Sequence, residues 1–321
     1  MPPALRALLD GLIDYAGLFP PARLDLDAAI RNYARYRTGP DAWMLGRFIV
    51  PVTQLDALDA YAELFDEAPP FRFSVLARPA EAADVPAAFV ADVEAARRWE
   101  GWYEGRVAAD RFELKLPAAL ADDRAALADL FGALDEAFAR REGEPARGFF
   151  EVDLLGEECE RGVEEAAAAA AEHNRRAGRA AVGLKFRCGG VTADAFPLPG
   201  VLAHALAVCR DAGVPFKATA GLHHPIRHFS DEVSAPMHGF LNVFGAAVLA
   251  SAHDFDRIAL TRVLCDEDAA DFRFEDGGFY WTEDWFVPAE AVAEIRDRFA
   301  TSYGSCSFDD PRDDLRSLGL I

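Results

Sequence analysis

The stretch AVGLKFRCGGVTADAFPLPGVLAHALAVCRDAGVPFKATAGLHHP, residues 181–225, decides the fold. Two short apolar runs within it, Val182–Phe186 and Pro215–Ala218, each carry one lysine and each lead into glycine. The residues between them have helical spacing, with a stop at Gly213. This order predicts a strand, a helix and a second strand parallel to the first. Ionisable groups then lie near the C-terminal ends of parallel strands, where α/β folds place their sites.

The same alternation of short apolar strands and amphipathic helices runs from the N-terminus to this stretch. Seven expected strands are marked by Ile13, Phe48, Phe71, Phe112, Phe149, Val182 and Phe216. An eighth strand is expected within Phe272–Trp281. Eight β/α units in one chain predict a (β/α)8 barrel of the TIM type. A doubly wound open parallel sheet is the alternative, although the chain lacks the glycine motifs of nucleotide-binding sheets.

Nothing in the chain marks a boundary between domains, so residues 1–321 are expected to form one barrel domain. The pattern changes after Gly221, which predicts a loop and helix insertion at about residues 222–252. Residues from about 288 to 321 are expected to form a C-terminal extension of the barrel.

Composition narrows the function classes. The 321 residues are 51% hydrophobic and 27% charged, which is typical of a globular protein. A net charge of −21 argues against nucleic acid and anionic membranes as partners. No apolar run has the length of a membrane span, and the N-terminus lacks the pattern of a signal peptide. The five cysteines form no CxxC pair. We therefore expect a cytoplasmic protein with a small-molecule substrate, and leave self-association open.

Lysine is rare, and the places where it occurs are informative. Of the 33 basic residues only Lys115, Lys185 and Lys217 are lysines. Arginine supplies the charge elsewhere, so the lysines are concentrated at positions that need an amine. An amine can lose its proton and attack a carbonyl group, which a guanidinium cannot do. All three lie in strand-like segments.

A barrel would bring the polar ends of these strands to one cavity. The residues expected there are Lys115, Glu151, Asp153, Lys185, Arg187, Lys217 and Thr219. Two neighbouring ammonium groups lower each other's pKa, and burial acts in the same direction. The prediction is a neutral amine that forms a Schiff base with a carbonyl substrate, while a carboxylate moves the protons.

The segment Glu151–Gly221 resembles deoxyribose-phosphate aldolase and related class I aldolases. EVDLL at 151–155 is similar to their E-I-D-x-V strand, and FKATAG at 216–221 is similar to their F-V-K-T-S-T-G strand. Between them, LKFRCGGVTAD and AVCRDAG follow the same order of elements. The resemblance implies a lyase in which Asp153 relays protons, Lys217 forms the Schiff base and Lys185 assists. It implies no cofactor.

The sequence also departs from that family. The aldolases carry a second lysine after the Schiff-base lysine, ahead of a phosphate-binding glycine pair. Here Lys185 and Gly189-Gly190 precede Lys217, and the segment HHPIRH at 223–228 has no counterpart. Taken as a whole, the chain also looks like a bacterial protein family of similar length, which implies no particular function.

Two other functions stay open. The loop after Gly221 holds His223, His224 and His228, which together with Asp153 could bind a divalent metal in a hydrolase or isomerase. In the favoured interpretation no metal is needed, and the residues that bind substrate are Lys115, Glu151, Arg187, Thr219, His223 and His224. The other alternative is a barrel that binds a metabolite without catalysis.

Several further polar residues are expected to be structural. Asp14 and Tyr15 lie near the end of the first strand and are interpreted as a turn aspartate and a core tyrosine. Cys306 has no catalytic partner nearby in the sequence and is interpreted as a structural thiol. Cys188 lies beside Lys185 and Arg187, which would lower its pKa if it were exposed, and it is also interpreted as non-catalytic.

Overall fold

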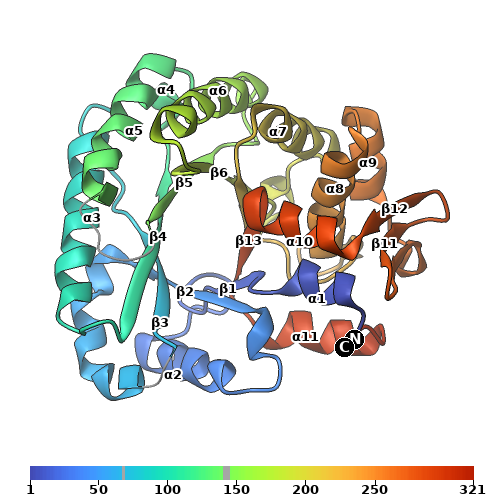
Figure 1. Ribbon diagram of the computed structural model, residues 1–321, viewed down its shortest axis with the longest axis horizontal. Helices are drawn as coiled ribbons and strands as arrows, with labels where there is room; N and C mark the ends of the chain where they lie inside the picture. The colour runs from blue at the N-terminus through green and yellow to red at the C-terminus, as the bar shows by residue number, and fades with distance from the viewer. Residues whose placement is uncertain (67–68, 140–144) are drawn as a thin grey trace.

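The computed structural model describes residues 1–66, 69–139 and 145–321, and eight parallel strands in them close into a barrel. Around the ring the order is β1–β13–β7–β6–β5–β4–β3–β2, as Figure 1 shows in a view through the barrel. The strands are β1 Ile13–Tyr15, β2 Leu45–Pro51, β3 Phe71–Leu76, β4 Val107–Lys115, β5 Arg147–Val152, β6 Val182–Arg187, β7 Phe216–Thr219 and β13 Ala300–Ser305. The (β/α)8 prediction is confirmed, and the open-sheet alternative is wrong.

Helices surround the barrel on its outside (Figure 1). They are α1 Pro3–Leu9, α2 Leu26–Arg37, α3 Val85–Gly101, α4 Ala118–Ala121, α5 Arg124–Ala139, α6 Cys159–Ala177, α7 Pro199–Ala212, α8 Phe240–His253, α9 Arg257–Cys265, α10 Ala289–Arg298 and α11 Asp309–Ser317. The turn after β2 is a 3-10 helix, Asp56–Asp66. The helix predicted between the two lysine strands is α7, and it ends at Gly213 in the left-handed conformation with φ +64°. Among the described residues, none of the helices combines the length and apolarity that crossing a membrane requires.

Side chains of a barrel strand point alternately outward to the helices and inward to the barrel interior. On β5, Phe150 points outward and packs on Phe131 of α5 and Phe89 of α3. Its neighbour Glu151 points the other way, into the barrel, because successive side chains of a strand face opposite sides. The apolar core therefore lies between strands and helices, and the barrel interior is free to hold charged groups.

The strand that closes the barrel is not where the sequence predicted it. Phe272–Trp281 forms β10 Phe272–Phe274 and β11 Gly278–Trp281, which pair antiparallel with each other outside the barrel. The other edge of β11 pairs antiparallel with β12 Trp285–Pro288. The eighth barrel strand is β13, with the sequence ATSYGS. Its inward residues are Ser302 and Gly304, so it lacks the apolar run that marks the other strands.

The two expected appendages belong to the barrel. Residues 222–252 contain a short hairpin, β8 His228–Ser230 with β9 Ala235–Met237, and α8, whose Phe244 packs on Phe216 of β7. Residues 288–321 are not an extension, because they supply α10, the closing strand β13 and α11. Asp309 of α11 accepts a hydrogen bond from the Tyr36 hydroxyl of α2 at 2.6 Å, which joins the two ends of the chain. Figure 1 shows both termini close together beside α1 and α11.

Candidate active site

Strand register sets four ionisable residues side by side. Lys115 of β4 pairs with Glu151 of β5, Glu151 pairs with Lys185 of β6, and Lys185 pairs with Lys217 of β7. Lys115 is exposed, Lys185 is 5% exposed and Lys217 is 0% exposed. Because barrel strands are tilted and staggered, a row that begins at the mouth on β4 descends into the interior by β7. Lys217 therefore lies deeper in the barrel than Lys185.

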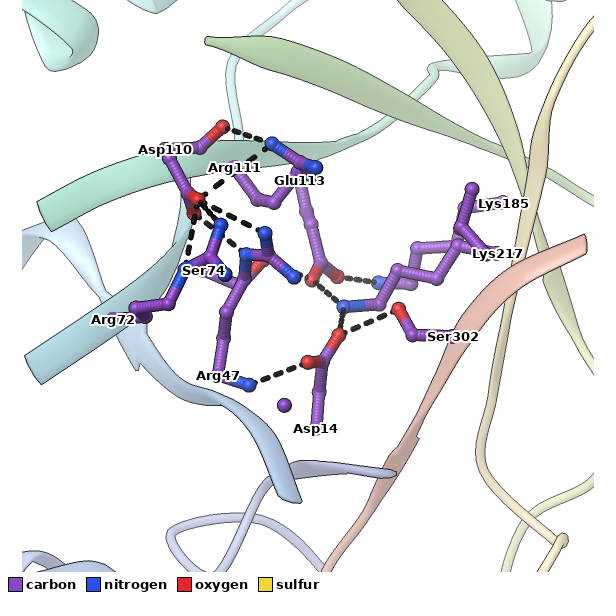
Figure 2. Close-up of polar contacts among 12 residues, drawn as sticks. Asp14, Arg47, Arg72, Ser74, Asp110, Arg111, Glu113, Lys185, Lys217 and Ser302 are labelled. Atoms are coloured by element: carbon purple, nitrogen blue, oxygen red, sulfur yellow. Dashed lines mark hydrogen bonds and ion pairs between the residues drawn. The ribbon is translucent and has the colours of Figure 1, made fainter. Parts of the chain in front are cut away.

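The row continues as a chain of alternating carboxylates and ammonium groups, which Figure 2 shows in part. Lys217 Nζ lies 2.5 Å from Asp14 Oδ2 and 2.6 Å from Glu113 Oε1. Lys185 Nζ lies 2.8 Å from Glu113 Oε2 and 2.9 Å from Glu151 Oε2. We call these five residues, Asp14, Lys217, Glu113, Lys185 and Glu151, the inner chain. It links five strands, β1, β7, β4, β6 and β5, by ion pairs within the barrel.

Two carboxylates of the inner chain, Asp14 and Glu113, accept further hydrogen bonds. Asp14 accepts one from the Ser302 hydroxyl at 2.7 Å and one from the Arg47 backbone amide at 2.6 Å. Glu113 accepts one from the Ser74 hydroxyl at 2.5 Å. Buried carboxylates need such partners, since an unpaired charge away from water is costly.

Charges in the inner chain outweigh burial in setting the proton equilibria. Burial alone would lower the pKa of Lys185, but Glu113 and Glu151 together raise it above its ordinary value. Burial alone would raise the pKa of Glu113, but Lys185 and Lys217 hold it well below the usual range. The pKa of Glu151 is lowered in the same way, by Lys185 and then Arg187. The sequence-based prediction of a lowered lysine pKa is wrong for Lys185, because a carboxylate lies between the two lysines.

A cavity of about 640 Å³ opens at the C-terminal ends of the barrel strands. Its polar lining comprises Glu113, Lys115, Glu151, Asp153, Lys185, Arg187, Thr192, Thr219, His223, Ser305 and Cys306. Lys185 reaches this cavity. Lys217 is not among the lining residues and lies beneath it, enclosed by Asp14 and Glu113. A molecule bound in the cavity would meet the amine of Lys185 and the carboxylate of Glu151 first.

Loops at the mouth complete the cavity. Arg187 ends β6, is half exposed, and places Nε 4.0 Å from Glu151 Oε1. Gly189 and Gly221 bring two loops together: a side chain at Gly221 would clash with the Gly189 backbone, and Gly221 has φ +71°. Glycine is therefore required where the β6 and β7 loops touch. Gly189, the first glycine of the pair after Lys185, has this structural role.

Asp153, the predicted proton relay, lies outside the inner chain. It is exposed at the mouth, lines the cavity, and accepts a hydrogen bond from the Leu155 backbone amide at 3.0 Å. It follows the last residue of β5, so it lies beyond the level of Lys185. Glu151, predicted as a substrate ligand, contacts Lys185 instead, together with Glu113.

The three histidines after β7, His223, His224 and His228, have different contacts. His223 lines the cavity, and its Nδ1 lies 3.9 Å from Cys306 Sγ. Burial lowers the pKa of His223 and raises that of Cys306, so the pair is an imidazole beside a thiol. His224 turns to Asp314 of α11 at 2.5 Å, and His228 Nδ1 lies 3.2 Å from the Ile226 carbonyl. Within residues 1–66, 69–139 and 145–321, no group of three or more His, Cys, Asp or Glu side chains is arranged to hold a metal ion.

A second charged cluster lies beside the inner chain (Figure 2). Asp110 is contacted by Arg47 Nε at 2.6 Å and by Arg72 Nη2 at 2.5 Å. Burial opposes ionisation of Asp110, but these guanidinium groups and Arg111 hold its pKa well below the usual range. The cluster ties β2, β3 and β4 together and carries an excess of positive charge.

Sequence reasoning missed Asp14, Glu113 and Ser302 as members of the site. Asp14 was interpreted as a turn residue, but it is fully buried at the centre of β1. Tyr15 is a core residue, as predicted. Glu113 lies two residues before Lys115 on the same strand, and that shared face was the available signal. Ser302 belongs to the strand that was not recognised.

Comparison with known proteins gives no family assignment. The chain matches no protein-family model and no curated protein sequence. The fold and the side chains of the site therefore carry the functional argument.

Proposed function

We propose that the protein is an enzyme that forms a Schiff base between Lys185 and a small oxygenated carbonyl compound, in an aldolase or lyase type of reaction. The observation that carries this proposal is the position of Lys185, which lines the cavity with Nζ 2.9 Å from Glu151. Barrel enzymes hold their active sites at this end of the strands. The resemblance to class I aldolases suggested Lys217 for this role, but Lys217 has no access to the cavity.

The proton balance of imine formation fits the Lys185–Glu151 pair. Lys185 first passes a proton to Glu151, and the free amine attacks the carbonyl carbon. After a proton moves from nitrogen to oxygen, the carbinolamine hydroxyl takes the proton of Glu151 and leaves as water. The product is a cationic imine beside two carboxylates, so the charge at this position is unchanged. The imine then accepts the electron pair of the breaking carbon–carbon bond, and Glu151 takes the proton of the adjacent hydroxyl.

Substrate binding is assigned to the mouth. Arg187 and Lys115 supply positive charge for an anionic group of the substrate, and Thr219 and His223 supply hydrogen bonds. His224 is engaged with Asp314, so its role is to hold the loop rather than to bind substrate. No cofactor is needed for this chemistry.

A second candidate function follows from the raised pKa of Lys185. A lysine that stays protonated can stabilise an enolate oxygen by donating a hydrogen bond, while Glu151 removes the proton from carbon. That reaction is an isomerisation or elimination without a covalent intermediate. It uses the same cavity and the same pair of side chains.

The decisive experiment is timed incubation with carbonyl compounds, a borohydride quench and peptide mapping by mass spectrometry. We expect a stable adduct on Lys185 with at least one aldehyde, ketone or keto acid. The Lys185→Arg variant keeps the charge but cannot form an imine, so its adduct should be absent. An adduct on Lys217 would overturn the assignment. Turnover without any adduct, lost on substitution of Glu151, would establish the second candidate.

The rate of adduct formation should be nearly independent of pH from about 6 to 9. The reactive state has a neutral Lys185 amine and a protonated Glu151, and it holds the same number of protons as the resting ion pair. A change in pH therefore does not alter the ratio of the two states. The lowered pKa of Glu151 sets the acid limit and the raised pKa of Lys185 sets the alkaline limit. The quench assay across this range should show a change below about threefold. A sigmoidal rise near pH 7 would indicate an unpaired amine with a lowered pKa.

A further inference from the structure

A second cavity, of about 550 Å³, adjoins the candidate active site. It lies behind the C-terminal ends of β4 and β5, against α4 and the first turns of α6. We call it the annex. Its lining includes Leu114, Leu116, Pro117, Ala118, Ala121 and Val152.

The walls of the annex are mainly apolar. Four of its lining residues are charged, and two of these, Asp122 and Glu158, already pair with Arg161 at 2.6 and 3.1 Å. The other two, Lys115 and Asp153, belong to the boundary with the active-site cavity. Most of the remaining surface consists of small aliphatic side chains. Binding of an apolar group to such a surface is favourable, because it removes apolar area from water.

The annex and the active-site cavity share a wall. Ala77, Pro79, Lys115, Val152 and Asp153 line both of them. At the mouth of the active-site cavity, Leu155 and Val191 are also apolar and are 50% and 54% exposed. The two cavities therefore adjoin along the shared wall, which places an apolar space next to the charged one.

We propose that the substrate is an amphipathic carbonyl compound: an anionic, oxygenated head in the active-site cavity and an aliphatic chain in the annex. The identity of the head rests on the proposed function, because it is assigned from Lys185 and Arg187. The chain is assigned independently, from the apolar lining and the shared wall. The bond between the anionic head and the aliphatic chain of the substrate would lie beside Lys115 and Asp153, which line both cavities.

Straight-chain carboxylates from butanoate to octanoate test the annex without the chemistry, because they have an anionic head and cannot form an imine. Isothermal titration calorimetry should show the Kd falling about two- to fourfold for each added methylene, as expected for burial of an apolar group. A Kd that does not change with chain length, or no binding by octanoate, would overturn the proposal.

Two neighbouring alanines of α4 provide a matched pair of variants. Ala118 lines the annex, whereas Ala119 does not, and both are exposed, so phenylalanine at either position leaves the core intact. In Ala118→Phe the gain with chain length should disappear while butanoate binds as before. In Ala119→Phe the series should match the unaltered protein. Equal behaviour of the two variants would place the chain elsewhere and contradict the assignment.

The outcomes separate this inference from the proposed function. A chain-length series that depends on Ala118, in a protein that gives no adduct on Lys185, would retain the annex and reject the Schiff base. An adduct on Lys185 together with a flat series would retain the Schiff base and reject the annex.

Discussion

Replacement of Lys217 by methionine is expected to lower the free energy of unfolding by about 3–5 kcal/mol. Lys217 is fully buried and is the cation that lies between Asp14 and Glu113. Methionine fills the same unbranched space but leaves two carboxylates facing each other in the barrel without that cation. Urea unfolding followed by circular dichroism measures the loss, and an unchanged m-value would show that the unfolded state is not affected.

A double variant separates the charge effect from packing. Asp14→Asn together with Lys217→Met removes one of the two uncompensated carboxylates, and Glu113 keeps Lys185 as its partner. We expect the double variant to recover at least half of the stability lost by Lys217→Met. A loss below about 1 kcal/mol in the single variant, a value typical of exposed ion pairs, would contradict the buried ion-pair interpretation. So would a double variant that is no more stable than the single one.

The fold was predictable because seven of the eight barrel strands carry a local apolar signal. Phe48, Phe71 and Phe112, for example, each lie in a strand that helices cover from outside, so the pattern survives in the sequence. The eighth strand lacks the signal because Ser302 faces Asp14 and Gly304 faces inward near Thr219. Phe272–Trp281 does form strands, but its aromatic residues pack against one another in a hairpin outside the barrel.

The candidate site was predictable only in part, since depth and charge balance depend on pairing between strands. The sequence indicates that Lys185 and Lys217 lie on neighbouring strands, but it does not reveal the register that sends one of them below the cavity. It also does not reveal that Glu113, from a strand two places away from β6, enters between them. The pKa of Lys185 was expected to be lowered, and Glu113 together with Glu151 raises it instead.

The inner chain has a consequence for reactivity at its outer end. It alternates three carboxylates with two ammonium groups, and Arg187 and Lys115 add positive charge at the mouth. Deep members are locked by two or more partners each, whereas Glu151 has one close ion pair and a looser one to Arg187 at 4.0 Å. Glu151 is therefore the carboxylate in the inner chain that can gain and lose a proton while a ligand is bound.

Glu151→Gln is accordingly expected to slow adduct formation on Lys185 by about 10²–10⁴-fold at pH 7, the range for loss of a general acid–base group. The variant also loses the carboxylate that exchanges its proton at the cavity, whereas Glu113 stays held by Lys217 and Ser74. Its flat pH profile should therefore become one that rises about tenfold per pH unit. Asp153→Asn should cost less than about tenfold and keep the flat profile, because Asp153 is exposed and is hydrogen-bonded to its own loop. The borohydride-quench assay measures all three proteins. If Asp153→Asn proves the more damaging change, the relay lies at the mouth, as the aldolase resemblance implies, and Glu151 serves only to hold Lys185.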